Sequence, residues 1–408
     1  MKRAVITGIG ILSPLGNNPK DFLSAAVAGK CVIRPIHKFD TAAFPVKFGG
    51  EIDCSQEEPL SLEQSAEMPT VAQWAVLAAR KAVIDADLNL AEEDPFAIDV
   101  VVGVSISSME VLQQEYLDGR GRGMAAAPPE AAVFMNPAAA AIQISRDMGL
   151  QGETTNITTA CSSSTTAIGY AARLIIHGES SCVITGGADE GITQLFLGAF
   201  GNTCLSHRND EPQRASRPFD RCRDGFVLSD SACIFVLEEY ERASARGANI
   251  YCEIGGFGSA SDAKSAMRID KSETAGARAI EQAMQRAACA PNEVDYYSAF
   301  GISMRSLDAR ETRMVKRVFK DHARKIAISS IKSMMGHPMG AAGAIQTAAC
   351  ALSIRQGVVF PTINYEEPDP ECDLDYVPNQ PRAMKIRKAV VYTLGNGGNN
   401  AALVLSAC

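Results

Sequence analysis

GETTNITTACSSSTTAIGYAARLIIH, residues 152–177, combines a strand-like run, a turn of small residues and an alanine-rich helical run. Cys161 lies in the turn, just ahead of the helical run. The first amides of a helix are unpaired and its dipole is positive at that end, so a thiolate there is stabilised. A turn of small residues between a strand and a helix also exposes its central side chain. We therefore expect Cys161 to be a reactive thiol of low pKa. The alternative is a buried structural cysteine.

Strand-like and helical segments alternate along the rest of the chain, which is typical of the α/β class. The helical run at residues 340–353 is almost uncharged, which predicts a helix buried on all sides in a layered fold. Strands are expected at residues 4–6, 99–104, 152–159, 182–185, 232–238, 250–257, 294–298, 326–329, 389–394 and 402–405, and helices at 71–86, 162–177, 275–288, 311–319 and 340–357.

Two internal echoes indicate a duplicated chain. A strand followed by a glycine turn opens at residues 5–10 and again at 254–258, and each half has a late glycine-rich turn. We therefore expect two halves, residues 1–245 and 246–408, with a helical hinge near residues 240–247. The Gly8-x-Gly10 pair lacks the third glycine and the later acidic residue of a dinucleotide fingerprint, so nucleotide binding is not expected.

Composition narrows the function classes. The chain has 408 residues, 12 cysteines and a net charge of −8, which argues against nucleic-acid binding. The cysteines are scattered without a Cys-x-x-Cys pair, so neither a disulfide framework nor a metal site is expected. With no signal peptide and no membrane-spanning run recognisable, we expect a cytoplasmic protein with no membrane partner.

Four further motifs accompany the Cys161 turn in a fixed order. They are RPFDRCRDGFV at residues 217–227, SAFGISM at 298–304, KSMMGH at 332–337 and GNGGNN at 395–400. Through these four motifs and residues 158–164, the chain resembles the β-ketoacyl-ACP synthase II family. Its members are the condensing enzymes of type II fatty acid and polyketide synthesis. The resemblance covers almost the whole chain. It implies a thiolase fold, with two pseudo-repeated halves in a five-layer α-β-α-β-α sandwich, and a dimer.

The resemblance also implies roles for individual residues. Cys161 would accept an acyl chain from an acyl carrier protein as a thioester. His337 would support chemistry at the thioester carbonyl, and Lys332 would order His337. The backbone amides of Cys161 and Asn396 would form the oxyanion hole. No cofactor is implied, because the phosphopantetheine arm belongs to the carrier protein.

The chain departs from the family on one loop. A family member carries Ala-His-Gly-Thr-x-Thr at residues 299–304, whereas this chain has Phe300, Ile302 and Met304 at the histidine and threonine positions. In the family, the histidine donates to the malonyl thioester carbonyl and the threonines bind the phosphopantetheine arm. These side chains offer no such hydrogen bonds. The gate position after Gly395, usually aromatic, is Asn396.

Two hypotheses follow. In the first, the chain is a non-condensing partner of a paralogous ketosynthase, like a chain-length factor. In the second, it keeps acyl–cysteine chemistry without decarboxylation, as an acyltransferase, a thioesterase-like hydrolase or a condensing enzyme with an altered extender. Retention of Cys161 favours the second, and loss of the loop residues favours the first.

The expected partners are an acyl carrier protein and a second subunit, in a homodimer or in a heterodimer with a paralogous ketosynthase. The apolar segment at residues 134–157 is the expected dimer face. An acidic carrier protein would need a basic docking patch. The candidate patch is a run of cations after the arm-binding loop: Arg310, Arg313, Lys316, Arg317 and Lys320. A plain solvated helix face is the alternative.

Overall fold

Ten strands form one mixed sheet in the computed structural model, which describes residues 2–106, 109–123, 125, 128–266 and 270–408. All ten overlap the strands expected from the sequence. Across the sheet they follow the order β10 (Ala327–Ser329), β9 (Tyr296–Ser298), β13 (Lys388–Gly395), β14 (Asn399–Ser406), β8 (Cys252–Ser261), β1 (Ala4–Leu12), β7 (Asp230–Glu239), β6 (Cys182–Glu190), β4 (Ile98–Gly103) and β5 (Thr154–Ile157). Two short pairs lie apart, β2 (Arg34–Pro35) with β3 (Phe48–Gly49) and β11 (Val358–Val359) with β12 (Arg382–Ala383).

The sheet consists of two five-stranded halves with one topology. β1 and β8 join the halves through only two residue pairs, Val5 with Glu253 and Ile6 with Cys252. Numbered within its own half, each set of strands has the order third, second, fourth, fifth, first. In both halves, the first three strands of this order run parallel to one another. The next strand pairs antiparallel with both of its neighbours. The expected pseudo-repeat is therefore confirmed.

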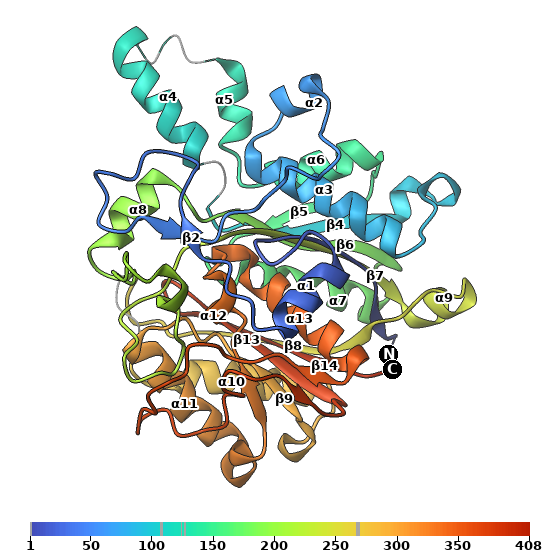
Figure 1. The fold of residues 1–408 in the computed structure, drawn as a ribbon. Coiled ribbons are helices and arrows are strands. Elements are labelled where there is room, and N and C mark those ends of the chain that lie inside the picture. Colours follow the sequence, from blue (N-terminus) through green and yellow to red (C-terminus); the bar gives the residue numbers. More distant parts are fainter. Residues whose placement is uncertain (1, 107–108, 124, 126–127, 267–269) are drawn as a thin grey trace.

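Helices cover both outer faces and fill the space between the halves (Figure 1). The outer layer over the first half contains α3 (Thr70–Asp85) and α6 (Ala139–Met148), and that over the second contains α10 (Thr274–Arg286) and α11 (Arg305–Phe319). The interior layer contains α7 (Ser163–His177) and α13 (Ala342–Gln356). The remaining α-helices are α1 (Pro19–Val27), α2 (Leu62–Ala66), α4 (Met109–Arg122), α5 (Pro129–Phe134), α8 (Gln194–Gly201), α9 (Tyr240–Ala245) and α12 (Lys332–Met335).

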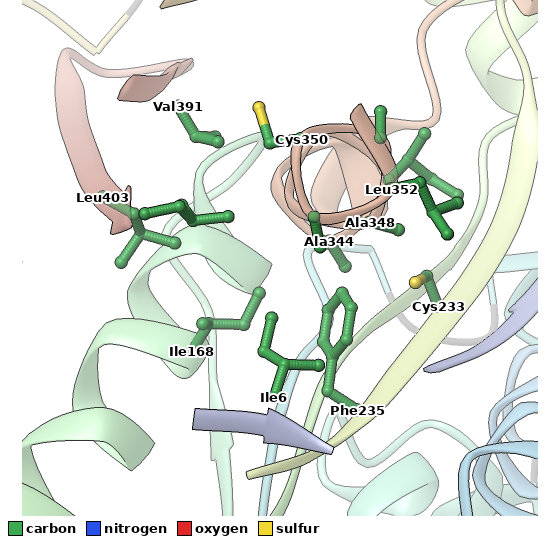
Figure 2. Close-up of a cluster of buried hydrophobic side chains, with 14 of the residues drawn as sticks. Ile6, Ile168, Cys233, Phe235, Ala344, Ala348, Cys350, Leu352, Val391 and Leu403 are labelled. Carbon is green, nitrogen blue, oxygen red and sulfur yellow. The ribbon is translucent and has the colours of Figure 1, made fainter. Parts of the chain in front are cut away.

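The interior position of α13 explains its composition. Every residue of α13 from Ala342 to Ser353 is buried, as expected from the sequence. Figure 2 shows Ala344 and Ala348 of this helix between Leu403 of β14 on one side and Phe235 of β7 on the other. Small side chains let the helix lie close to both halves of the sheet, and the absence of charged residues from Ala342 to Ser353 avoids burying unpaired groups. The five layers of a thiolase fold are thus present.

The paired glycines of the two opening strands are packing sites. A Cβ at Gly8 of β1 would lie 2.1 Å from the carbonyl oxygen of Ala82 in α3, and one at Gly256 of β8 would lie 2.1 Å from that of Ala283 in α10. Only glycine permits this approach of helix to strand. The echo seen in the sequence is therefore the same strand–helix contact made twice.

The two halves meet in sequence after α9. β7 ends at Glu239, α9 follows it, and β8 begins at Cys252, so the predicted division at residue 245 lies between the last strand of one half and the first of the other. Within the described ranges, no helix combines the length and apolarity that crossing a membrane requires.

Candidate active site

Cys161 lies in a tight turn between β5 and α7. Ala160, directly before it, has a left-handed backbone with φ 53°, a conformation that costs free energy in a residue other than glycine. Hydrogen bonds hold the turn: Ser163 Oγ accepts from Thr159 N at 2.9 Å and donates to the Ala160 carbonyl at 2.6 Å. Ser162 Oγ donates to the Thr159 carbonyl at 2.7 Å. The serines of the motif therefore fix the strained turn that presents the thiol.

Burial dominates the electrostatics of Cys161. It raises the pKa of the thiol to about 11, although hydrogen bonds from the backbone amides of Asn396 and Cys161 itself act in the opposite direction. The expected low pKa is therefore wrong, because desolvation outweighs the effect of the helix end. Those two amides are the ones expected to form the oxyanion hole, and they do lie at the sulfur. Their role toward a substrate stays a prediction.

His337 follows α12 and is buried between two phenylalanine rings. Its ring centroid lies 5.7 Å from that of Phe226 and 5.4 Å from that of Phe300, both edge-on. Neither ring nitrogen of His337 has a hydrogen-bond partner among the described residues. Burial, and secondarily the charge of Lys332, lower its pKa well below the usual value. The imidazole is thus neutral, and its nitrogens are free to bond to a substrate.

Lys332 is also buried, and its ammonium contacts Gln346 and the Phe300 ring. Its ammonium donates to Gln346 Oε1 at 2.9 Å and lies 5.1 Å from the Phe300 ring centroid. Among the described residues, no hydrogen bond joins Lys332 to His337, so the expected ordering of His337 by Lys332 stays a prediction. The positive charge of Lys332 acts on His337 by lowering the pKa of the imidazole.

The loop at residues 299–304, which differs from the family, lies against His337 and Lys332. Phe300 and Ile302 are buried, and Met304 is half-buried at the end of the loop, before α11. Glu311 of α11 accepts from the backbone amides of Phe300 and Gly301, both at 2.8 Å. Asp308 accepts from the amide of Ile302 at 3.2 Å. The phenylalanine thus occupies a fixed place beside His337.

Three acidic residues that position this site were missed from the sequence. Asp189, at the end of β6, accepts from the amides of Ser105, Ile106 and Gly340 and so joins the loop after β4 to the one after His337. Its burial raises its pKa to about 6. Asp308 and Glu311 are the other two, and burial raises the pKa of Glu311 to about 7. For Asp308 and Glu311, the available signal was the presence of acidic residues among the cations of α11.

Three of the five cations in the expected docking run are paired with acidic side chains. Arg310 is buried and pairs with Asp262 at 2.9 Å, while Arg313 pairs with Glu273 at 2.6 Å. Lys316 pairs with Asp373. The charges of these three residues are therefore largely neutralised by side chains that lie far away in the sequence, and the docking role of the run stays a prediction. In the described part of the chain, no His, Cys, Asp and Glu cluster could hold a metal ion.

Comparisons with known proteins agree with this geometry. Residues 1–243 match the model of the beta-ketoacyl synthase N-terminal domain, and residues 251–366 match that of the C-terminal domain. The chain is 40% identical to a 3-oxoacyl-[acyl-carrier-protein] synthase 2 of Coxiella burnetii, over 99% of this chain and 98% of the relative.

Solved structures give the same likeness. The ishigamide ketosynthase/chain length factor has a TM-score of 0.92 at 30% identity, covering 100% of this chain and 99% of that one. A type II polyketide synthase ketosynthase in complex with its acyl carrier protein has a TM-score of 0.91 at 30% identity, with the same coverage.

Proposed function

Because the chain belongs to the β-ketoacyl synthase family, we propose that it is the chain-length-factor-like partner of a paralogous ketosynthase, with impaired decarboxylative condensation of its own. One observation carries this proposal: the buried Phe300 ring stands against His337, where the family has a second imidazole. A phenyl ring cannot donate a hydrogen bond to the enolate that forms when malonyl thioester loses carbon dioxide.

The neighbouring losses act on the carrier arm. Ile302 and Met304 replace the threonines that bind phosphopantetheine in the family, and Asp308 and Glu311 hold the loop rigidly. Without those hydroxyl groups, the loop cannot hold the arm in a reactive position. A rigid apolar loop suits a subunit that contributes surface and leaves condensation to its partner.

The edge strand β5 supports assembly with a second subunit. Within the described residues, β5 pairs with β4 alone, which leaves its other edge open for another chain. Met135 and Ile142 nearby are 39% and 42% exposed. The alanines of α6, which also contributed to the expected dimer face, are buried within this chain. The proposed interface is therefore β5 with the exposed side chains of residues 134–157.

Reconstitution with the paralogous ketosynthase tests the partner role. The two subunits should co-purify, and the pair should elongate an acyl chain on the acyl carrier protein. Cys→Ala at the ketosynthase's own nucleophile should abolish product, whereas Cys161→Ala in this chain should leave product formation by the pair intact. Loss of product in the second case, with the pair still assembled, would contradict a passive role.

Cys161 itself favours a second candidate function, acyl transfer through the thiol. The strained turn and the two amides at the sulfur have been retained, which a purely structural subunit does not need. Incubation with acyl-carrier protein, followed by intact-protein mass measurement, separates the two. An acyl mass shift that Cys161→Ala removes supports acyl transfer, and an unshifted mass supports the passive partner.

A further inference from the structure

Arg310 of α11 faces the protein interior and pairs with Asp262, which directly follows β8. The Arg310 side chain is 4% exposed and that of Asp262 is 3% exposed. Arg310 Nη2 donates to Asp262 Oδ1 at 2.9 Å, and its Nε donates to the Ser272 carbonyl at 2.9 Å. A buried ion pair adds little net stability to a fold, but it can fix one arrangement of the chain. The arrangement that this pair fixes lies around the Asp262 carboxylate.

Asp262 and Asn400 together hold one backbone carbonyl, that of Gly398. Asp262 Oδ1 accepts from Asn400 Nδ2 at 3.0 Å, in addition to the guanidinium. Asn400 Nδ2 also donates to the Gly398 carbonyl at 2.9 Å, and the backbone amide of Asp262 donates to the same carbonyl at 2.9 Å. The Tyr392 hydroxyl donates to Asn400 Oδ1 at 2.6 Å. The Asn400 side chain is thus held at both its oxygen and its nitrogen, and it holds the Gly398 carbonyl in turn.

Gly398 ends the glycine turn, residues 395–398, which joins β13 to β14. The tip of this turn lacks side-chain packing: Asn396 is exposed, and a Cβ placed on Gly397 would meet no atom of the described residues within 4 Å. At the Gly398 end, a Cβ would lie 2.6 Å from that of Asp262, so the two backbones are in close contact. Glycine-rich backbone is conformationally permissive. Contacts at its two ends therefore set the position of the glycine turn.

The other end of the glycine turn lies against the Cys161 turn. A Cβ on Gly395 would lie 2.2 Å from the Thr159 carbonyl oxygen, so the two backbones touch. The Gly398 amide donates to the Gly395 carbonyl at 3.0 Å, which links the two ends of the glycine turn. A shift at Gly398 is therefore passed to Gly395. The amide that follows Gly395 is one of the two at the Cys161 sulfur.

We propose that Arg310 is a positioning residue for the glycine turn. By fixing the Asp262 carboxylate and, through it, the Gly398 carbonyl, Arg310 keeps the amide expected in the oxyanion hole at the sulfur. A cation that the sequence places in a docking surface thus acts on the active site from the interior. This inference does not depend on the proposed partner role, because it concerns where the amide lies and not which reaction the chain performs.

Two small reagents measure whether the amide is in place at Cys161, with the labelled peptide followed by mass spectrometry. p-Nitrophenyl acetate acetylates the thiol: the sulfur bonds to the ester carbonyl through a tetrahedral oxyanion, and p-nitrophenolate leaves. Iodoacetamide alkylates the same thiol by displacement of iodide, and no oxyanion forms. Both rates depend on the thiolate, so their ratio reports the oxyanion hole. Arg310→Met should lower this ratio about tenfold or more, since one oxyanion donor contributes about 10²–10³ in rate.

Hydrogen exchange of the peptide at residues 395–400 measures the glycine turn directly. In Arg310→Met its amides should exchange about tenfold faster, because a charge-assisted hydrogen bond has been removed from their support. Arg310→Lys keeps a cation for Asp262 and should restore most of both readouts. Arg324→Met is the matched control: it removes another guanidinium paired with an aspartate, Asp373 at 3.2 Å, and should leave both readouts at the wild-type values.

Folding of the variants is checked by thermal melting before the rates are compared. If Arg310→Met does not fold, the double variant Arg310→Met, Asp262→Ala takes its place, because removing both charges leaves neither of them buried alone. The same two changes are expected of it. Either readout left unchanged in the folded variant would overturn the proposal, and so would a wild type whose Cys161 is alkylated but not acetylated.

Discussion

Replacing Phe300 by histidine tests whether the missing hydrogen-bond donor, and not a changed loop backbone, prevents decarboxylation. The Phe300 ring lies 5.4 Å from the His337 ring centroid and 5.1 Å from Lys332 Nζ. An imidazole at position 300 would therefore stand in the same pocket and restore one hydrogen-bond donor toward a developing enolate. The amides of Phe300 and Gly301 would still be held by Glu311, so the backbone should not move.

The expected gain follows from the worth of one positioned donor. Such a donor contributes about 10²–10³ in rate, or roughly 2.7–4 kcal/mol of transition-state stabilisation. Phe300→His should therefore raise decarboxylation of malonyl-carrier protein by up to that factor. Elongation should recover much less, because Ile302 and Met304 still leave the carrier arm unheld.

The assay measures acetyl- and malonyl-carrier protein by mass over time, with Phe300→Leu as the matched variant that changes the ring without adding a donor. The Phe300→Leu variant should stay at the wild-type background, while the Phe300→His variant rises above it. The reasoning fails if the wild type already decarboxylates rapidly and neither variant changes the rate, since residue 300 would then not limit the chemistry.

Further predictions concern the thiol, the interface, the cations of α11 and the buried lysine. At pH 7, iodoacetamide should label the exposed Cys408 before the half-buried Cys161, because desolvation raises the pKa of the Cys161 thiol to about 11. The reverse order by peptide mass spectrometry would contradict this. Ile142→Lys should weaken dimerisation in light scattering, whereas Leu62→Lys, at an exposed leucine outside residues 134–157, should not. Charge reversal of Arg313 and Lys316 should leave carrier-protein binding unchanged in titration calorimetry, because both are already paired, and a clear loss would restore the docking patch. The free energy of unfolding should rise with pH between about 7 and the unfolded-state pKa of lysine, because the unfolded chain binds the Lys332 proton more tightly than the folded chain does. In guanidinium titrations, Lys332→Met should flatten this rise. A slope that Lys332→Met leaves unaltered would contradict the lowered pKa of Lys332.

The layered fold could be predicted from local patterns because its signals are local. Short apolar runs bounded by glycines mark the buried strands, and the uncharged stretch from Ala342 to Ser353 of α13 predicts an interior helix. The glycine pairs at Gly8 and Gly256 indicated duplication, although the reason for them, close contact with α3 and α10, required the structure.

The electrostatics of the site could not be predicted in this way, because burial is decided by residues far apart in sequence. Cys161 has the helix end that favours a thiolate, yet surrounding side chains remove the water that would stabilise it. The sequence predicts Arg310 on a cationic helix surface, whereas in the folded chain Arg310 is buried and forms an ion pair with Asp262. Gln346, in an apolar helix, reads as part of the core, and its carbonyl partners come from other elements.

Condensation by the chain alone, and by the chain with the paralogous ketosynthase, tests the central claim most directly. Acyl-primed and malonyl-carrier proteins are mixed with each preparation, and elongated products on the carrier protein are measured by mass. We expect no elongation by the chain alone and sustained elongation by the pair. Vigorous elongation by the chain alone would contradict the claim that Phe300, Ile302 and Met304 leave it unable to condense.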